Sequence, residues 1–186
     1  MKTMIIQGLY KRTIMISLLI FILAICISFL VSNYVIEKTY ESMGILLMYN
    51  GSPDEENRSL KDAKTYRAIA TGTQMMNEIT SELDIQYTVR DMRNKIIVSY
   101  EDNTDLLYIK TEDGDPEMAF KITKAMMDKL QNRVRELFGN SHLKVVEEPY
   151  IPFEPSGPNI VLNMVIAGIF AIFLAVLVNV WNQKCR

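Results

Sequence analysis

Two long uncharged segments, one near each end, dominate the hydrophobic pattern of the chain. Residues 13–36 and 160–181 contain no Asp, Glu, Lys or Arg. An α-helix rises about 1.5 Å per residue, so even the shorter segment gives a rod of roughly 33 Å, enough to cross the apolar core of a bilayer. The first segment exceeds the roughly 7–15 apolar residues of a signal peptide, and no Ala-x-Ala site follows it. The pattern therefore predicts two uncleaved transmembrane helices.

Between them, residues 37–148 alternate between strand and helix periodicities. Apolar and β-branched runs bounded by turn residues predict four strands, at 39–49, 95–101, 106–111 and 143–147. Apolar residues at helical spacing predict a helix from Ser59 or Asp62 to Ser81, with Gly72 as a weak point or break.

Two further helices begin at recognisable capping signals. Thr88 and Asp91 have the spacing of a capping box. Asp115-Pro116-Glu117 predicts the start of a long helix, which Gly139 ends. Its apolar stripe comprises Met118, Ile122, Ala125, Met126, Leu130, Val134 and Leu137. Phe120 and Met127 form a second apolar edge, which faces either a neighbouring protomer or a thicker core. The expected fold is an α/β domain, a small sheet with about three helices, between the two spans.

A proline-rich strap, residues 149–159, joins this domain to the second apolar segment. Pro149, Pro152, Pro155 and Pro158 recur at every third position. Proline fixes φ and lacks an N–H, so the strap cannot join a helix or a central strand. The spacing predicts a stiff, extended polyproline-type connector that lies outside the core of the domain.

Charge is partitioned sharply between the ends and the middle of the chain. All 22 acidic residues lie in 37–159 together with 15 of the 20 basic residues, a net charge of −7. The other five basic residues lie in the two tails, 1–12 and 182–186. We expect the N-terminal tail, 1–12, to be too short to fold by itself. Short basic ends favour the cytoplasmic side of a membrane. We therefore expect a two-pass membrane protein, with both termini cytoplasmic and an extracytoplasmic domain.

The central domain offers no set of residues suited to catalysis. Asp113 and Asp115 have the spacing of a metal-binding pair, but a helix cap at Asp115 and a solvated turn at Asp113 account for both. Asp102 and Asp105 fit a hairpin turn in the same way. His142 is the single histidine, so no histidine cluster or catalytic triad can be assembled. We expect no catalytic residue, no metal, no cofactor and no nucleic-acid partner.

Small residues recur along the second span. Ala167, Ala171 and Ala175 stand at every fourth position and align on one face, with Gly168 adjacent. Small side chains let helix backbones approach closely within lipid, which predicts a helix-packing face and favours a homo-oligomer. Asn163 and Asn179 are placed to hydrogen-bond across helices near the two ends of the span.

Several stretches together resemble the polysaccharide chain-length determinant family, also called polysaccharide co-polymerases. They are Thr65-Tyr66-x-x-Ile69 with Met76-x-x-Ile79-x-x-x-Leu83-x-Ile85, Val89-x-x-Met92-x-x-x-Ile96-x-Val98 with Asn103-Thr104-Asp105-Leu106-Leu107-x-Ile109, Asp115-Pro116-x-x-Ala119, and Pro152-x-x-Pro155-x-x-Pro158 before the second span. The resemblance covers nearly the whole chain. The 23-residue helix over 116–138 matches the short type, which is similar to the membrane activators of capsule tyrosine kinases in single-membrane bacteria.

The resemblance implies a non-catalytic oligomeric scaffold in a bacterial cell membrane, which sets the chain length or assembly of a capsule or exopolysaccharide. The implied partners are the membrane, a polysaccharide polymerase or its lipid-linked product, and a separate cytoplasmic tyrosine kinase. Lys184 and Arg186 in the short tail are the candidate kinase contacts. The alternative function is an extracytoplasmic ligand-sensing module that signals through a partner protein.

Overall fold

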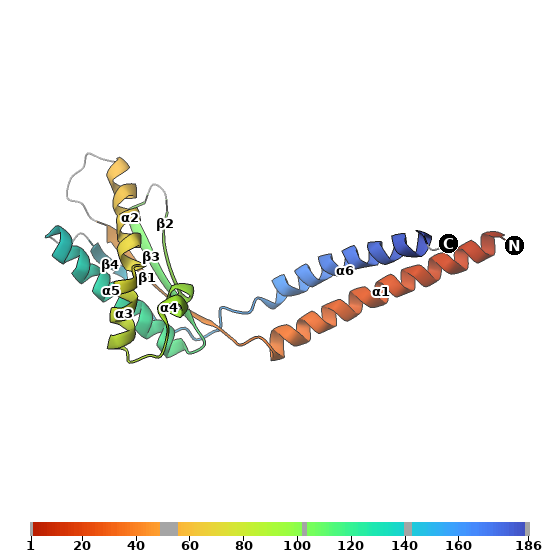
Figure 1. Ribbon diagram of the computed structural model, residues 1–186, viewed down its shortest axis with the longest axis horizontal. Coiled ribbons are helices and arrows are strands. Elements are labelled where there is room, and N and C mark those ends of the chain that lie inside the picture. Colours follow the sequence, from red (N-terminus) through yellow and green to blue (C-terminus); the bar gives the residue numbers. More distant parts are fainter. Residues whose placement is uncertain (1, 49–55, 102–103, 140–142, 185–186) are drawn as a thin grey trace. The chain divides into compact units, whose positions relative to one another are not determined.

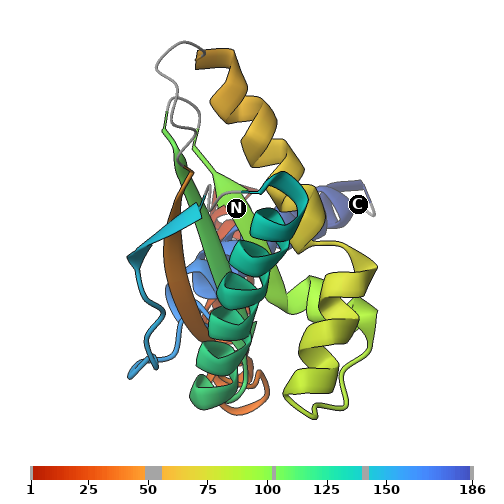
Figure 2. The same cartoon turned by 90° about the vertical axis from the view of Figure 1, so that its left-hand side faces the viewer.

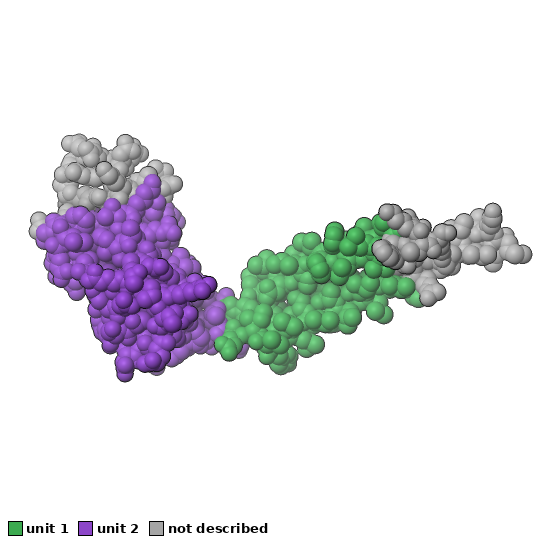
Figure 3. Space-filling model, viewed as in Figure 1, with its two compact units in different colours: residues 1–37, 157–186 green, residues 38–156 purple. Residues whose placement is uncertain are grey.

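The computed structural model divides the chain into two units, coloured separately in Figure 3. One unit comprises residues 1–37 and 157–186, and the other comprises residues 38–156. The structure describes residues 2–48, 56–101, 104–139 and 143–184. Asp102, His142 and Arg186 lie outside these ranges.

The first unit is a hairpin of two long helices. Helix α1 (Lys2–Tyr34) and helix α6 (Ile160–Lys184) run side by side in opposite directions, so the two ends of the chain lie at the same end of the hairpin (Figure 1). The stretches Met15–Tyr34 and Ile160–Val178 are each long and apolar enough to cross a membrane.

Helix α1 begins earlier than the sequence pattern predicted. Residues 2–12, expected to be too short to fold, continue the helix toward the N-terminus. Once the apolar segment has nucleated a helix, each added residue gains a hydrogen bond without a new nucleation cost.

The second unit is built on a four-stranded antiparallel sheet. Its strands are β1 (Tyr40–Met48), β2 (Ile96–Tyr100), β3 (Leu106–Asp113) and β4 (Leu143–Glu147). Their order is β2-β3-β1-β4, so β3 and β1 are central. All four predicted strands are confirmed, and a register shift between Ile45 and Leu46 marks a bulge where β1 pairs with β4.

The described part of this unit also contains four helices: α2 (Glu56–Ala70), α3 (Thr73–Glu82), α4 (Val89–Lys95) and α5 (Pro116–Phe138). Helices α2, α3 and α5 lie on the same side of the sheet (Figure 2). Helix α2 begins before Ser59, so the predicted caps at Ser59 and Asp62 are wrong. The predicted break is confirmed, since Gly72 precedes α3 with an extended backbone.

The two capping signals are confirmed. Thr88 and Asp91 form a reciprocal capping box at the start of α4. The Asp115 side chain accepts a hydrogen bond from the Glu117 N–H, and α5 ends at Gly139, whose φ is +90°. Glycine occupies this left-handed region without a steric penalty, which explains the stop.

Alternating residues of the sheet, one face of α5 and buried residues of α2, α3 and α4 form the core. Its largest fully buried side chains include Leu46, Met76, Ile79, Leu107, Ile109, Ile122, Met126, Met127 and Leu130. Because Met127 is buried inside the unit, the second apolar edge of α5 thickens the core at that position and is not a free contact surface there. The prediction for Leu137 is wrong, because this side chain in the last turn of α5 is 59% exposed.

A single glycine lets α5 approach the sheet. A Cβ atom placed on Gly44 in β1 would collide with the Met127 sulfur and would lie 3.3 Å from the Glu147 carbonyl oxygen. Protein cores are close-packed, and added atoms force side chains off their rotamers.

We predict that Gly44→Ala lowers the free energy of unfolding by about 1–3 kcal/mol, because the added methyl overpacks the contact with α5. In a Met127→Ala background the same substitution costs less, because the colliding sulfur is gone. Denaturant unfolding of the four variants in mild detergent measures this coupling. Equal effects of Gly44→Ala in both backgrounds would contradict it.

Candidate functional site

The strap is fastened to the first strand of the domain. The Ser42 hydroxyl donates to the Tyr150 carbonyl oxygen at 2.8 Å. The Ser156 N–H donates to the Thr39 carbonyl oxygen at 2.8 Å, and the Ser156 hydroxyl approaches the same oxygen at 3.1 Å. These bonds hold both ends of the segment 150–156 against β1 and the residue before it.

The strap is therefore part of the domain along much of its length. Pro149 and Pro152 are buried, Pro155 is exposed, and Pro158 belongs to the helical unit, two residues before α6. The expectation that the strap lies outside the core is wrong for Pro149 and Pro152, because the fold buries both residues. The strap also bends at Phe153 and Glu154, so it is not one straight extended segment.

A buried carboxylate joins three elements at the end of the sheet where β1 begins. Asp113, opposite Tyr40 in the register, has only 4% of its surface exposed. Its oxygens accept hydrogen bonds from the Tyr87 hydroxyl and the Asp115 N–H, each at 3.0 Å. Lys95 Nζ lies 3.0 Å from the carboxylate and 4.7 Å from the centre of the Tyr87 ring.

The predicted solvated turn at Asp113 is therefore wrong. β3 extends two residues beyond the predicted strand, and its alternation turns this side chain inward. The helix cap at Asp115 is confirmed. Sequence reasoning missed Tyr87 and Lys95, which become partners of Asp113 only after the chain folds.

The environment of the cluster moves the pKa values of its three members. Burial favours the protonated form of Asp113, but the hydrogen bonds from Asp115, Lys95 and Tyr87 outweigh it and lower the pKa of this carboxyl. Burial also opposes the charge on Lys95, yet the Asp113 carboxylate raises the pKa of its ammonium group. Burial, followed by the hydrogen bond to Asp113, raises the pKa of the Tyr87 hydroxyl.

We predict that Asp113→Ala lowers the free energy of unfolding by about 3 kcal/mol at neutral pH, because it leaves Lys95 unpaired. A carboxyl with a lowered folded pKa stabilises the fold above its unfolded pKa, and this contribution fades as the pH falls from about 5. Unfolding measured from pH 7 to pH 3 should show a smaller loss of stability in the variant than in the wild type.

Alkaline titration provides a second readout of the same cluster. Raised folded pKa values of Lys95 and Tyr87 give stability that is present below their unfolded values and is lost above about pH 10. Asp115→Ala, which removes a nearby helix cap but leaves the cluster in place, is the matched control. Parallel pH profiles for Asp113→Ala and wild type would contradict the assignment.

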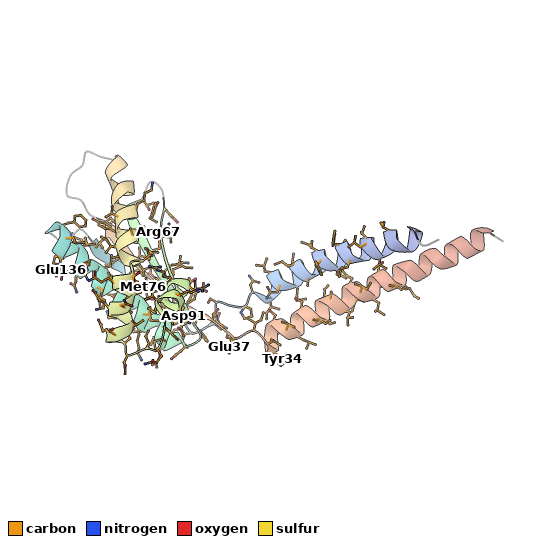
Figure 4. The ribbon with its side chains drawn as sticks, viewed as in Figure 1. Tyr34, Glu37, Arg67, Met76, Asp91 and Glu136 are labelled. Carbon is orange, nitrogen blue, oxygen red and sulfur yellow. The ribbon has the colours of Figure 1, made fainter. Side chains whose placement is uncertain are left out.

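The small residues of α6 occupy two kinds of position in the helical hairpin. Gly168 and Ala171 are buried, and a Cβ atom on Gly168 would lie 3.5 Å from the Phe21 ring of α1. Ala167 and Ala175 are half-buried. Figure 4 draws the described side chains of both helices, and many of them are exposed apolar groups, such as Leu19 in α1 and Ile169 in α6.

A polar contact joins the two helices near the end at which α6 begins. The Asn163 side-chain amide donates to the Ser32 hydroxyl at 2.9 Å, and Ser32 is 2% exposed. This confirms the predicted bond across helices for Asn163. The side chains of Asn179 and Lys184 are not described.

We predict that Ala171→Leu lowers the melting temperature of the full chain in mild detergent by several degrees, because the larger side chain separates the helices. Ile172→Leu is the matched control, since Ile172 is 57% exposed on the same helix. Intrinsic fluorescence during heating measures both variants. Equal melting temperatures for Ala171→Leu, Ile172→Leu and wild type would contradict a packed Ala171.

Across the described ranges, no three or more His, Cys, Asp or Glu residues are grouped so that they could hold a metal ion. Three described features unite distant parts of the chain: the fastened strap, the Asp113 cluster and the helical hairpin.

No family model matches the chain. It is 27% identical over 183 residues to the capsular polysaccharide biosynthesis protein CpsC of Streptococcus pneumoniae, covering 92% of this chain and 79% of that protein. It is 26% identical over 141 residues to the uncharacterized protein YveK of Bacillus subtilis, covering 72% and 60% of the two chains. It is 23% identical over 156 residues to a capsular polysaccharide biosynthesis protein CpsC of Streptococcus agalactiae, covering 80% and 68%.

A solved structure of a full-length bacterial polysaccharide co-polymerase aligns with 93% of this chain and 95% of its own, at 11% identity and a TM-score of 0.43.

Two apolar helices and an α/β domain between them define the class: this is a two-pass membrane protein. The relatives confirm the resemblance to the polysaccharide chain-length determinant family that the sequence motifs indicated.

Proposed function

We propose that this chain is a non-catalytic, oligomeric membrane scaffold that regulates the chain length or assembly of a surface polysaccharide, either a capsule or an exopolysaccharide. The observation that carries the proposal is the similarity to the pneumococcal CpsC protein over 92% of the chain, a share that includes residues of both helices and of the domain.

The contacts of the domain support a mechanical role. The two ends of the segment 38–156 lie close together, because the Ser156 N–H donates a hydrogen bond to the Thr39 carbonyl oxygen. The strap is bonded to the domain at Tyr150 and Ser156, so the link to α6 starts from a fixed point. Such a scaffold acts by holding a partner in place, and the partner we propose is the polysaccharide polymerase or its lipid-linked product.

The basic residues at the two ends of the chain support an orientation with both termini cytoplasmic. The hairpin geometry agrees with this proposal, because both ends of the chain lie at one end of the unit (Figure 1). In this orientation Lys184 and Arg186 face the cytoplasm, where a separate tyrosine kinase would meet them. Ala167 and Ala175, which the hairpin leaves half-buried, are the proposed contacts between protomers.

We predict that deletion of the gene changes the size or amount of the surface polysaccharide without stopping the synthesis of its sugar precursors. Pro155→Gly with Pro158→Gly should shift the polymer length distribution, because glycine converts a stiff connector into a flexible one. These two prolines are chosen because Pro149 and Pro152 are buried. Gel analysis of extracted polysaccharide, with immunoblots for protein abundance, measures the shift.

Pro53→Gly, a substitution of the same kind outside the strap, is the matched control and should leave the length distribution unchanged. A wild-type distribution from the strap variant at normal abundance would argue against a positioning role for the strap. Normal polysaccharide after complete deletion, in a strain without a second copy, would refute the proposed function.

A further inference from the structure

The strap presents three uncharged apolar side chains to solvent. Phe153 is 96% exposed, Tyr150 is 50% exposed and Ile151 is 44% exposed. Singly exposed apolar residues are common on protein surfaces, but a nearly fully exposed phenylalanine forgoes the large gain that aromatic burial provides. A surface that covers Phe153 would therefore be favoured.

The exposure of Phe153 is imposed by the fold. It lies three residues after Tyr150 and three residues before Ser156, the two points at which the strap is bonded to the domain. The segment between them is short and contains Pro152 and Pro155, which restrict its backbone. Phe153 therefore stays presented at the end of the domain from which both chain ends leave.

Chain length keeps Phe153 close to the membrane span. Seven residue steps separate it from Ile160, the first residue of α6 and of its apolar stretch. At no more than about 3.6 Å per step, Phe153 lies within about 25 Å of the start of the span, whatever direction the domain takes. This tether raises the local concentration of lipid around the side chain, so a weak contact suffices.

We propose that Phe153, with Tyr150 and Ile151, inserts into the headgroup region of the bilayer and docks this end of the domain on the membrane surface. Aromatic side chains are enriched at that depth. Electrostatic adsorption does not provide an alternative, because residues 37–159 carry a net charge of −7, and Glu154 beside Phe153 is itself exposed. The proposed contact with lipid is therefore the insertion of the uncharged side chains of Phe153, Tyr150 and Ile151.

A tryptophan placed at position 153 tests the proposal directly. The chain has one tryptophan, so Trp181→Phe provides a background in which Phe153→Trp is the only reporter. The full chain is reconstituted in phosphatidylcholine vesicles with and without bromine on the acyl chains, since bromine quenches a tryptophan in contact with lipid. Leu137→Trp in the same background is the matched control, because Leu137 is 59% exposed at the C-terminal end of α5 in the same unit.

We expect brominated lipid to reduce the emission of Trp at position 153 at least two-fold and to leave that of Trp at position 137 unchanged. No quenching at position 153 would overturn the proposal, even if its emission is shifted to the blue, since a protein partner would then cover the side chain. Equal quenching at both positions would also overturn it, because lipid contact would then not be specific to the strap. Matching circular dichroism spectra establish that both variants are folded.

Discussion

The antiparallel pairing of β1 with β3 is the interaction on which the rest of the domain depends. β1 also pairs with β4, packs against α5 at Gly44, and binds the strap through Ser42. A one-residue slip in this register would turn every side chain of β1 to the opposite face. Ser42 would lose the strap, and a larger side chain would replace Gly44 beneath α5. The register therefore fixes the core and the attachment of the second membrane helix at once.

The polar contacts at the start of β1 serve the same end of the domain. The register places Tyr40 opposite Asp113, and the Asp113 cluster joins the end of β3 to the end of α4 and to the start of α5. The bond from Ser156 to Thr39 lies one residue before β1 begins. Buried polar groups stabilise a fold only when they are fully satisfied. The groups that satisfy Asp113 lie at the end of the domain where the chain enters at residue 38 and leaves at residue 156. They therefore stiffen this end of the domain.

Local signals in the sequence predicted most of the elements but few of the contacts between them. Strand alternation, the Thr88 capping box, the Asp115 cap and the Gly139 stop each depend on neighbouring residues, so spacing alone revealed them. Extending the alternation of Leu107, Ile109 and Thr111 by one step would have placed Asp113 inside. The contacts of Asp113 with Tyr87 and Lys95, the bond from Ser42 to the strap, and the bond from Ser156 of the strap to Thr39 join segments up to 117 residues apart. Such pairings follow from topology and strand order, which no local pattern specifies.

Fastening the strap also bears on how the two membrane helices associate. Helix packing in lipid lacks a hydrophobic driving force and depends on close backbone approach and a few polar contacts, each of modest strength. In this chain the domain brings its two ends within one hydrogen bond of each other, so α1 and α6 are attached to adjacent points. This raises their effective concentration, and weak contacts such as those of Gly168 and Ala171, with the Asn163–Ser32 bond, then suffice to form the hairpin. The fold of the domain thus contributes to the association of the two membrane helices.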